Sequence, residues 1–249
     1  MVELKSPQEI EKMRAAGNIV AETLKLVEKE AKPGVPTSRL DKLAEDYIRS
    51  RGATPSFLNY RGFPASVCIS IGCEVVHGIP SKKRVIEEGQ LVSIDIGAYL
   101  NGYHGDAARS FFVGEPNETE SKLLAVTRQA LERGIAQARD GNFLGDISFA
   151  IQSCAEENGF SVVRDLVGHG IGRKMHEEPQ IPNYGKPKTG IQLKEGMTMA
   201  IEPMVNLGTW MVEFLDDNWT VVTKDRKLSA HFENTIAITK DKAEVLTIS

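Results

Sequence analysis

Residues 88–95, with the sequence EGQLVSID, recur 107 positions later as residues 195–202, with the sequence EGMTMAIE. Each copy begins with Glu-Gly, continues as an apolar run and ends in an acidic residue, Asp95 in the first copy and Glu202 in the second. A short apolar run that follows a turn signal is typical of a buried strand. The repeat therefore predicts two related strands that carry a carboxylate at the same position.

Helical patterns ahead of these strands repeat with the same offset. The helix predicted over residues 37–51 has apolar positions at helical spacing, and the same positions are apolar again in residues 147–155. A longer helix precedes each of them. The first begins at a capping box formed by Ser6 and Glu9, and the second begins after Asn117. Each copy of the repeat therefore consists of two helices followed by strands.

The two copies make up almost the whole chain. The first spans about residues 7–113 and the second about residues 119–240, and no linker rich in Pro, Gly or Ser separates them. Helices combined with strand-rich segments in this way are typical of α/β (α+β) proteins. We therefore expect an α/β fold of two pseudo-symmetric halves that share one core, in a single domain over residues 1–249.

A predicted hairpin brings two acidic residues together. Residues 91–100 and 103–113 both have strand character, and Asn101-Gly102 between them is a strong signal for a two-residue turn. Counting back from this turn puts Asp95 and Asp106 on one face as diagonal neighbours, with about 7 to 8 Å between their Cα atoms. Both carboxylates can then reach metal ions that lie between them.

Two glutamates extend this acidic pair to a cluster. Glu202 is the repeat mate of Asp95, and an offset of 127 relates Asp106 to Glu233, which lies on a strand predicted over residues 228–239. Four carboxylates around one axis repel one another at pH 7 unless cations lie between them. The cluster therefore indicates a metal site.

A histidine is expected to complete the ligand set. His169 lies in the sequence VGHGIG at residues 167–172, where glycines let the backbone approach a ligand closely. Spacing alone does not identify which of the five histidines binds a metal. Carboxylates with one imidazole suit a pair of Mn, Fe, Co or Zn ions, and two such ions can share a hydroxide, polarise a carbonyl and hold a free amine. The pattern indicates hydrolysis of an amide next to an amino terminus.

Composition excludes several other classes of protein. The net charge is -4 and no dense block of Lys and Arg occurs, which argues against a nucleic-acid groove. No run approaches the roughly 20 apolar residues of a membrane span, and the amino terminus has no secretion signal, so we expect a cytoplasmic protein without membrane contact. The three cysteines have no C-x-x-C spacing and are expected to be reduced thiols.

Eight short segments together resemble the type I methionine aminopeptidases of bacteria, over essentially the whole chain. They are SVCIS (66–70), VVHGIP (75–80), SIDIG (93–97), HGD (104–106), GHGIG (168–172), HEEPQIPNY (176–184), MAIEP (199–203) and SAHFE (229–233). The resemblance implies the pita-bread fold around a central dinuclear site. It also implies removal of the initiator methionine from nascent proteins with a small second residue, by a hydroxide that bridges two divalent ions (Co, Mn, Fe, Zn or Ni).

The resemblance also implies a role for each candidate site residue. The ligands of one metal would be Asp95, Asp106 and Glu233, and those of the other would be Asp106, His169, Glu202 and Glu233. The catalytic residues would be His77, His176 and Glu202, and the two histidines would also contact the substrate. The methionine side chain would lie in a pocket of Tyr60, Phe63, Cys68 and Trp219, and Phe57 stands where some members of the family have a smaller residue.

The partners implied by the resemblance are nascent polypeptides, met by a monomer that associates transiently with the ribosome. Two other functions stay open: a proline-directed peptidase of the same fold, and a metal-free binding module. Proline-directed peptidases have an additional amino-terminal domain, whereas a capped helix begins here at Ser6, and no zinc-binding extension precedes it. Metal-free relatives lose ligands, whereas all five are present. The 30 residues between Glu202 and Glu233 leave no room for the helical insertion of type II enzymes.

Overall fold

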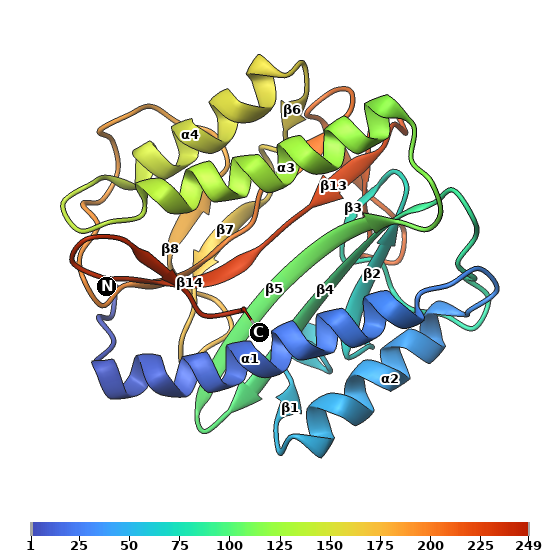
Figure 1. Ribbon diagram of the computed structural model, residues 1–249, viewed down its shortest axis with the longest axis horizontal. Helices are drawn as coiled ribbons and strands as arrows, with labels where there is room; N and C mark the ends of the chain where they lie inside the picture. Colours follow the sequence, from blue (N-terminus) through green and yellow to red (C-terminus); the bar gives the residue numbers. More distant parts are fainter. Residues whose placement is uncertain (1, 249) are drawn as a thin grey trace.

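Four helices cover one side of a layer of curved strands. The computed structural model describes residues 2–248. The helices are α1 (Pro7–Glu30), α2 (Thr37–Ser50), α3 (Glu118–Gln137) and α4 (Leu144–Glu157). Figure 1 shows α1 and α2 along the bottom of the molecule and α3 and α4 along the top, so each half contributes one helix pair.

The predicted helix starts are confirmed. At α1 the Ser6 hydroxyl accepts from the Glu9 amide at 3.4 Å, and the Glu9 carboxylate accepts from the Ser6 amide at 2.8 Å. Asn117 and Glu120 form the same reciprocal pair at α3. These bonds satisfy amide donors that the first turn of a helix leaves open.

The first half folds into a sheet in the order β1-β4-β2, with β5 also paired to β4. Its elements are β1 (Thr54–Pro55), the 3-10 turn η1 (Tyr60–Gly62), β2 (Val67–Ile71), β3 (Glu74–Val76), β4 (Leu91–Leu100) and β5 (Tyr103–Phe112). The β4–β5 turn has positive φ angles of 52° at Asn101 and 89° at Gly102, as a type I′ hairpin requires. Asp95 lies opposite Ala108, so the predicted register is confirmed.

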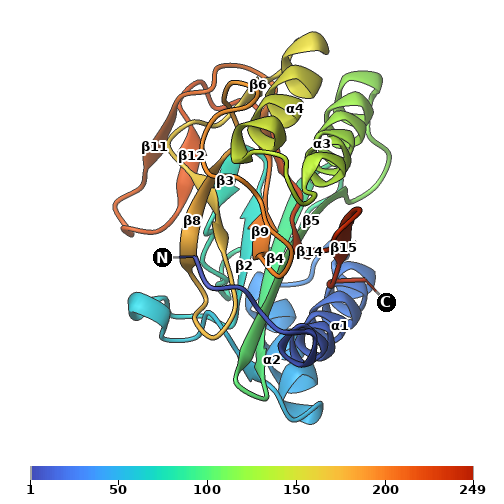
Figure 2. The same cartoon turned by 90° about the vertical axis from the view of Figure 1, so that its left-hand side faces the viewer.

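The second half supplies a sheet in the order β15-β14-β9-β7-β8 and a smaller one in the order β13-β10-β6, while β3 joins β11 and β12 in a third. Its strands are β6 (Ser161–Val162), β7 (Val167–Gly170), β8 (Glu177–Pro182), β9 (Thr198–Ile201), β10 (Met204–Asn206), β11 (Val212–Phe214), β12 (Val221–Thr223), β13 (Ser229–His231), β14 (Asn234–Ile238) and β15 (Ala243–Val245). Seen from the side in Figure 2, β8 and the hairpin of β11 and β12 lie on the opposite side of the molecule from α1 and α3.

The single strand predicted over residues 228–239 is wrong, because the chain changes sheets within it. β13 ends at His231 and pairs with β10, whereas β14 begins at Asn234 and pairs with β9. In the break between them, the Glu233 amide instead donates to the carbonyl of Ala108 at 2.9 Å. Apolar residues keep the same phase on both sides of the break, and Asn234 is the one polar residue in that phase. A single polar residue is common within a strand, so the pattern did not distinguish one strand from two.

The α/β arrangement of two halves is confirmed, but the expectation that the halves share one core is wrong, because each half packs its helices against its own strands around its own apolar core. One core consists of residues between Ile19 and Val113, and another is built almost entirely from residues between Leu123 and Ile238. A third cluster spans both halves, since Met13 and Phe63 pack there with Ile171 and Met175. This shared cluster lies beside the candidate site. Within the described residues, no helix is long and apolar enough to cross a membrane.

Candidate metal centre

The predicted ligands meet at the centre of the molecule, where the two halves face each other. β4 and β5 carry Asp95 and Asp106, and β7 carries His169. Asp106, His169 and Glu233 are buried, and Asp95 and Glu202 are half-buried. Ligand atoms of Asp106, His169 and Glu233 all lie within 4.8 Å of one another.

Glu202 and Glu233 leave the backbone from two facing breaks in the sheets. Glu202 falls between β9 and β10, and Glu233 falls between β13 and β14. On one side of the breaks Ile201 pairs with Asn234, and on the other side Met204 pairs with His231. Both carboxylates therefore lie where the chain passes from one sheet to the next. At such a break the side chain does not have to follow the alternation between the two faces of a sheet.

The imidazole of His169 is oriented for a cation. Its Nδ1 lies 2.9 Å from the carbonyl of Gly170, which can only accept, so Nδ1 carries the proton. Burial lowers the pKa of His169 to about 4, so Nε2 presents a lone pair at neutral pH. That atom lies 3.7 Å from Oδ2 of Asp106 and 3.6 Å from Oε1 of Glu202. A lone pair facing two carboxylates needs a cation between them.

The carboxylates themselves lack partners. Among the described residues, Oδ1 of Asp95, Oδ1 of Asp106 and Oε1 of Glu233 are buried without a hydrogen bond. Burial raises the pKa of all four acids, to about 7 for Asp95 and well above the usual range for Asp106, Glu202 and Glu233. Repulsion from neighbouring carboxylates raises the pKa of Asp106 further. Because a buried anionic cluster is stable only with protons or metal ions, these residues fit a divalent metal.

A cavity of about 140 Å³ opens onto this cluster, and all eleven residues singled out from the sequence line it. Phe57, Arg61 and Met175 line it as well. Sequence reasoning had noted Phe57 but missed Arg61 and Met175. Met175 directly precedes His176, so adjacency to a recognised residue was the one signal that could have identified it.

Aromatic rings and sulfur atoms form one end of the cavity. The rings of Phe63 and Trp219 meet edge to face with centroids 5.1 Å apart. Cys68 lies opposite Asp95 on the neighbouring strand. Burial is the main reason that the pKa of its thiol lies well above the usual value, and the nearby carboxylates raise that pKa further. The thiol is therefore neutral, and this end of the cavity suits an apolar side chain.

His77 is held in an unusual backbone conformation at the edge of the cavity. Its φ is 60°, which costs a residue other than glycine of order 1 to 3 kcal/mol and is often found at functional sites. The following Gly78 packs so closely on β2 that a Cβ there would lie 2.2 Å from the carbonyl of Ile69. Burial lowers the pKa of His77, so its ring is neutral.

His176 enters the cavity from the segment between β7 and β8. Its ring stacks on that of Tyr60 and lies beside that of His169, with centroids 5.3 and 4.1 Å apart. Burial, and next the proximity of His169 and Arg61, lowers the pKa of His176 to about 3. This imidazole is also neutral at physiological pH.

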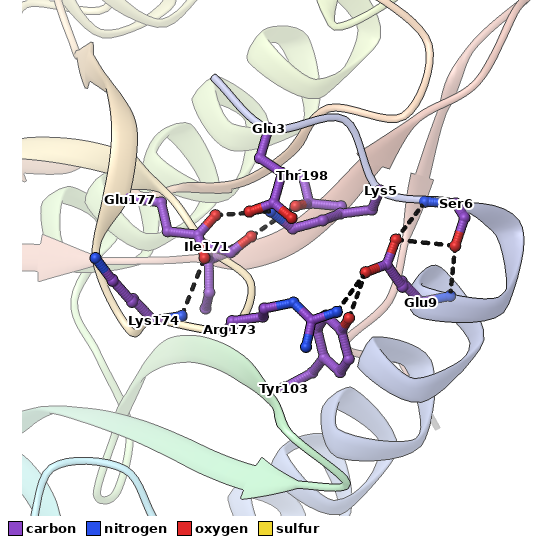
Figure 3. A network of polar contacts seen from close by, with 10 residues as sticks. All are labelled: Glu3, Lys5, Ser6, Glu9, Tyr103, Ile171, Arg173, Lys174, Glu177 and Thr198. Carbon is purple, nitrogen blue, oxygen red and sulfur yellow. Dashed lines mark hydrogen bonds and ion pairs between the residues drawn. The ribbon is translucent and has the colours of Figure 1, made fainter. Parts of the chain in front are cut away.

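The segment that carries His176 is tied to the amino-terminal segment (residues 2–6) and to the start of α1 (Figure 3). The fully buried ammonium group of Lys5 lies 2.8 Å from the carboxylate of Glu177, which also accepts from the Lys174 amide at 3.0 Å. Arg173 donates to Glu9 at 2.9 Å. These contacts fix residues 171–177 from outside the cavity.

A wider hollow adjoins the cavity and leads to solvent. Its volume is about 620 Å³, and Arg61, His169 and His176 line both spaces. The outer part is polar, with Arg173, Lys174, Glu178 and Gln180 among its lining residues. A small apolar side chain can therefore be bound at the inner end while the rest of a chain extends outward.

The chain is similar to known proteins over its whole length. The model of metallopeptidase family M24 matches residues 11–240. The methionine aminopeptidase of Clostridium acetobutylicum is 55% identical over 248 residues, which cover 100% of this chain and 99% of that protein. The crystal structure of methionine aminopeptidase from Thermotoga maritima matches with a TM-score of 0.98 and 47% identity over 100% of both chains. A prolidase from Pyrococcus furiosus matches less well, with a TM-score of 0.80 and 26% identity, and the match covers 65% of that chain.

Proposed function

Since this chain belongs to the bacterial methionine aminopeptidases of metallopeptidase family M24 and removes amino-terminal methionine, we propose that its buried carboxylate centre binds two divalent ions for this hydrolysis. The observation that carries the proposal is the lone pair of His169, directed at Asp106 and Glu202 among carboxylate oxygens without partners. The pita-bread fold of the family supplies the two halves between which these ligands lie.

The five residues divide between two metal positions. The first position is formed by Asp95, Asp106 and Glu233, and the second by Asp106, His169, Glu202 and Glu233. A site of carboxylates and one imidazole accepts Co, Mn, Fe, Zn or Ni, and cellular supply selects among them. The ions supply Lewis acidity and lower the pKa of a coordinated water.

The protein side chains bind and orient the substrate. The methionine side chain occupies the pocket of Tyr60, Phe63, Cys68 and Trp219. Met175 and Phe57 also line this pocket. Thioether sulfur contacts aromatic rings favourably, at roughly 0.3 to 1.5 kcal/mol per contact. His77 and His176 are neutral and hydrogen-bond the scissile amide and the oxygen that develops charge, and Glu202 completes the catalytic set.

The second residue of the substrate lies between His77 and the metal ligands, where space is limited. Small second residues are therefore accepted and large ones are excluded by contact. Later residues extend into the wider hollow of about 620 Å³. This arrangement fits a cytoplasmic monomer with a single catalytic domain that meets nascent chains at the ribosome.

The test combines metal content with a panel of peptides. We expect two ions per chain in protein titrated with Mn²⁺ or Co²⁺, and the highest kcat/KM for Met-Ala-Ser. Nle-Ala-Ser should be a fair substrate because norleucine is also unbranched. Ile-Ala-Ser, N-acetyl-Met-Ala-Ser and Met-Lys-Ser should be poor because of the branched Cβ, the blocked amine and the large second residue, respectively. Equal rates on all five peptides would show that the cavity does not select methionine.

A further inference from the structure

Tyr60 contacts both the methionine pocket and a catalytic histidine. Its ring lines the cavity, and its hydroxyl oxygen lies 2.8 Å from Nδ1 of His176. The two rings are stacked with an angle of 17° between their planes. The same side chain therefore lines the cavity and contacts His176 with both its ring and its hydroxyl.

The direction of this hydrogen bond follows from the partners available. A phenol hydroxyl donates well and accepts weakly, whereas the unprotonated nitrogen of a neutral imidazole is a good acceptor, so the shared bond runs from Tyr60 to His176. A bond donated by Tyr60 to Nδ1 satisfies both groups. A neutral imidazole that accepts at Nδ1 carries its proton on Nε2. No described residue accepts from Nε2, which leaves that donor free for a ligand in the cavity.

The backbone around Tyr60 is built to hold the side chain in place. Asn59 and Arg61 on either side have φ angles of 64° and 50°, a conformation that is costly for residues other than glycine. The turn is closed at its base, where the Asn59 amide donates to the carbonyl of Phe63 at 2.9 Å. The Tyr60 amide donates to the carbonyl of Phe57, also at 2.9 Å. Backbone strain that persists beside a cavity is a sign of a position fixed for function.

We propose that Tyr60 is a positioning residue whose hydroxyl holds His176 in the tautomer with the proton on Nε2 and keeps that donor directed at the substrate. The proposal rests on the role assigned above to His176 and adds the group that determines which nitrogen of its ring carries the proton. It also links specificity to catalysis, because a side chain bound against the Tyr60 ring contacts the group that orients His176.

The state of the ring can be measured without any substitution. Protein labelled with ¹⁵N-histidine is loaded with diamagnetic Zn²⁺, and the His176 signals are identified by their absence from the His176→Ala spectrum. We expect a protonated Nε2, and an Nδ1 shift characteristic of a nitrogen that accepts a hydrogen bond. A proton on Nδ1 of His176 in the wild-type protein would overturn the proposal.

Tyr60→Phe removes only the hydroxyl and keeps the ring that lines the pocket. We expect the Nδ1 signal of His176 to move toward that of a nitrogen without a hydrogen bond. We expect kcat for Met-Ala-Ser to fall about fivefold to tenfold, the effect of one neutral hydrogen bond, while KM and metal content stay within about twofold. Tyr184→Phe is the matched control, since Tyr184 is exposed and lies outside the cavity.

Three kinetic outcomes would contradict the proposal in different ways. An unchanged kcat in Tyr60→Phe together with a large loss in His176→Ala would show that His176 acts without help from Tyr60. An unchanged kcat in both variants would show that His176 itself has no catalytic role, which would also remove that part of the proposed function. A rise in KM with unchanged kcat in Tyr60→Phe would assign the hydroxyl to substrate binding alone.

Discussion

Individual side chains at the metal centre are arranged at a cost in stability that metal ions offset. Four acids with raised pKa values surround a histidine whose neutral ring directs a lone pair at them. Without cations these groups repel one another or bind protons, and with cations the same groups become ligands. The same side chains that bind metal ions for catalysis therefore destabilise the folded protein when no metal is bound.

Asp106→Asn should separate the two effects. Without metal, Asp106 must either bind a proton or repel Asp95 and Glu233, and both cost stability; asparagine avoids this cost, so we expect a higher melting temperature in metal-depleted protein. With Mn²⁺ present, we expect a lower melting temperature than for the wild type, because tight metal binding stabilises the folded state, and a loss of more than about a hundredfold in kcat/KM. Asp165→Asn, at an exposed position, is the control. Wild-type turnover and metal content in Asp106→Asn would contradict the ligand assignment.

The stability of metal-depleted protein should fall as the pH rises above about 6.5. All five histidines have lowered pKa values when folded, so they affect the pH dependence only below their unfolded pKa of about 6.5. The raised pKa values of the four acids act in the opposite direction. The folded state holds protons that the unfolded state has lost, so stability decreases as these protons dissociate near pH 7 and above.

Thermal melts of metal-depleted protein between pH 6.5 and 9 measure this decline. The same melts with saturating Mn²⁺ should not show it, because metal ions take the place of the protons. Parallel curves with and without metal would show that the carboxylates do not control the pH dependence.

At the scale of elements, the sequence was sufficient wherever the local pattern determined the structure. Capping boxes, the Asn101-Gly102 turn and the apolar period fixed the four helices and the β4–β5 register. The break at Glu233 was not predictable in this way. Whether that segment pairs with β9 or β10 depends on residues some 30 positions earlier in the chain, and its own apolar residues keep one phase with only Asn234 out of pattern. The position of the break was determined by pairing with strands that are distant in sequence, which the segment itself does not encode.

The segment that carries His176 contacts the amino-terminal segment, which is far away in sequence, through the ion pair of Lys5 and Glu177 in Figure 3. Lys5 has no exposed side-chain surface, and its partner Glu177 follows His176 directly. We expect Lys5→Met to leave Glu177 without its cation, to increase hydrogen exchange in residues 171–177 and to lower kcat about tenfold with metal content unchanged. Lys29→Met, on an exposed part of α1, is the control. Unchanged exchange and kcat would show that β7 and β8 hold residues 171–177 in place without the amino-terminal segment.

At the scale of the whole molecule, the metal centre lies on the seam between the halves. Along this seam β5 of the first half contacts the chain around β13 and β14 of the second. The Thr235 hydroxyl accepts from the amide of Asp106 at 2.9 Å and donates to its carbonyl at 2.8 Å. Ser110 makes the equivalent pair of bonds to the backbone of His231, both at 2.8 Å. A ligand-bearing strand is thus held in place by the opposite half.

Thr235→Val tests whether this seam positions the metal ligands. The substitution keeps the shape and leaves the buried amide of Asp106 without its acceptor, at a cost of about 1 to 3 kcal/mol. For a chain of this length that corresponds to a fall of roughly 2 to 12 °C in melting temperature. Thr127→Val is the matched control, because the buried Thr127 hydroxyl donates to the Leu123 carbonyl inside α3 and touches no ligand. We expect only Thr235→Val to weaken Mn²⁺ binding measured by calorimetry, by about tenfold or more. If both variants lose stability and both keep wild-type Mn²⁺ affinity, the seam contributes to folding and the ligand geometry is fixed within each half.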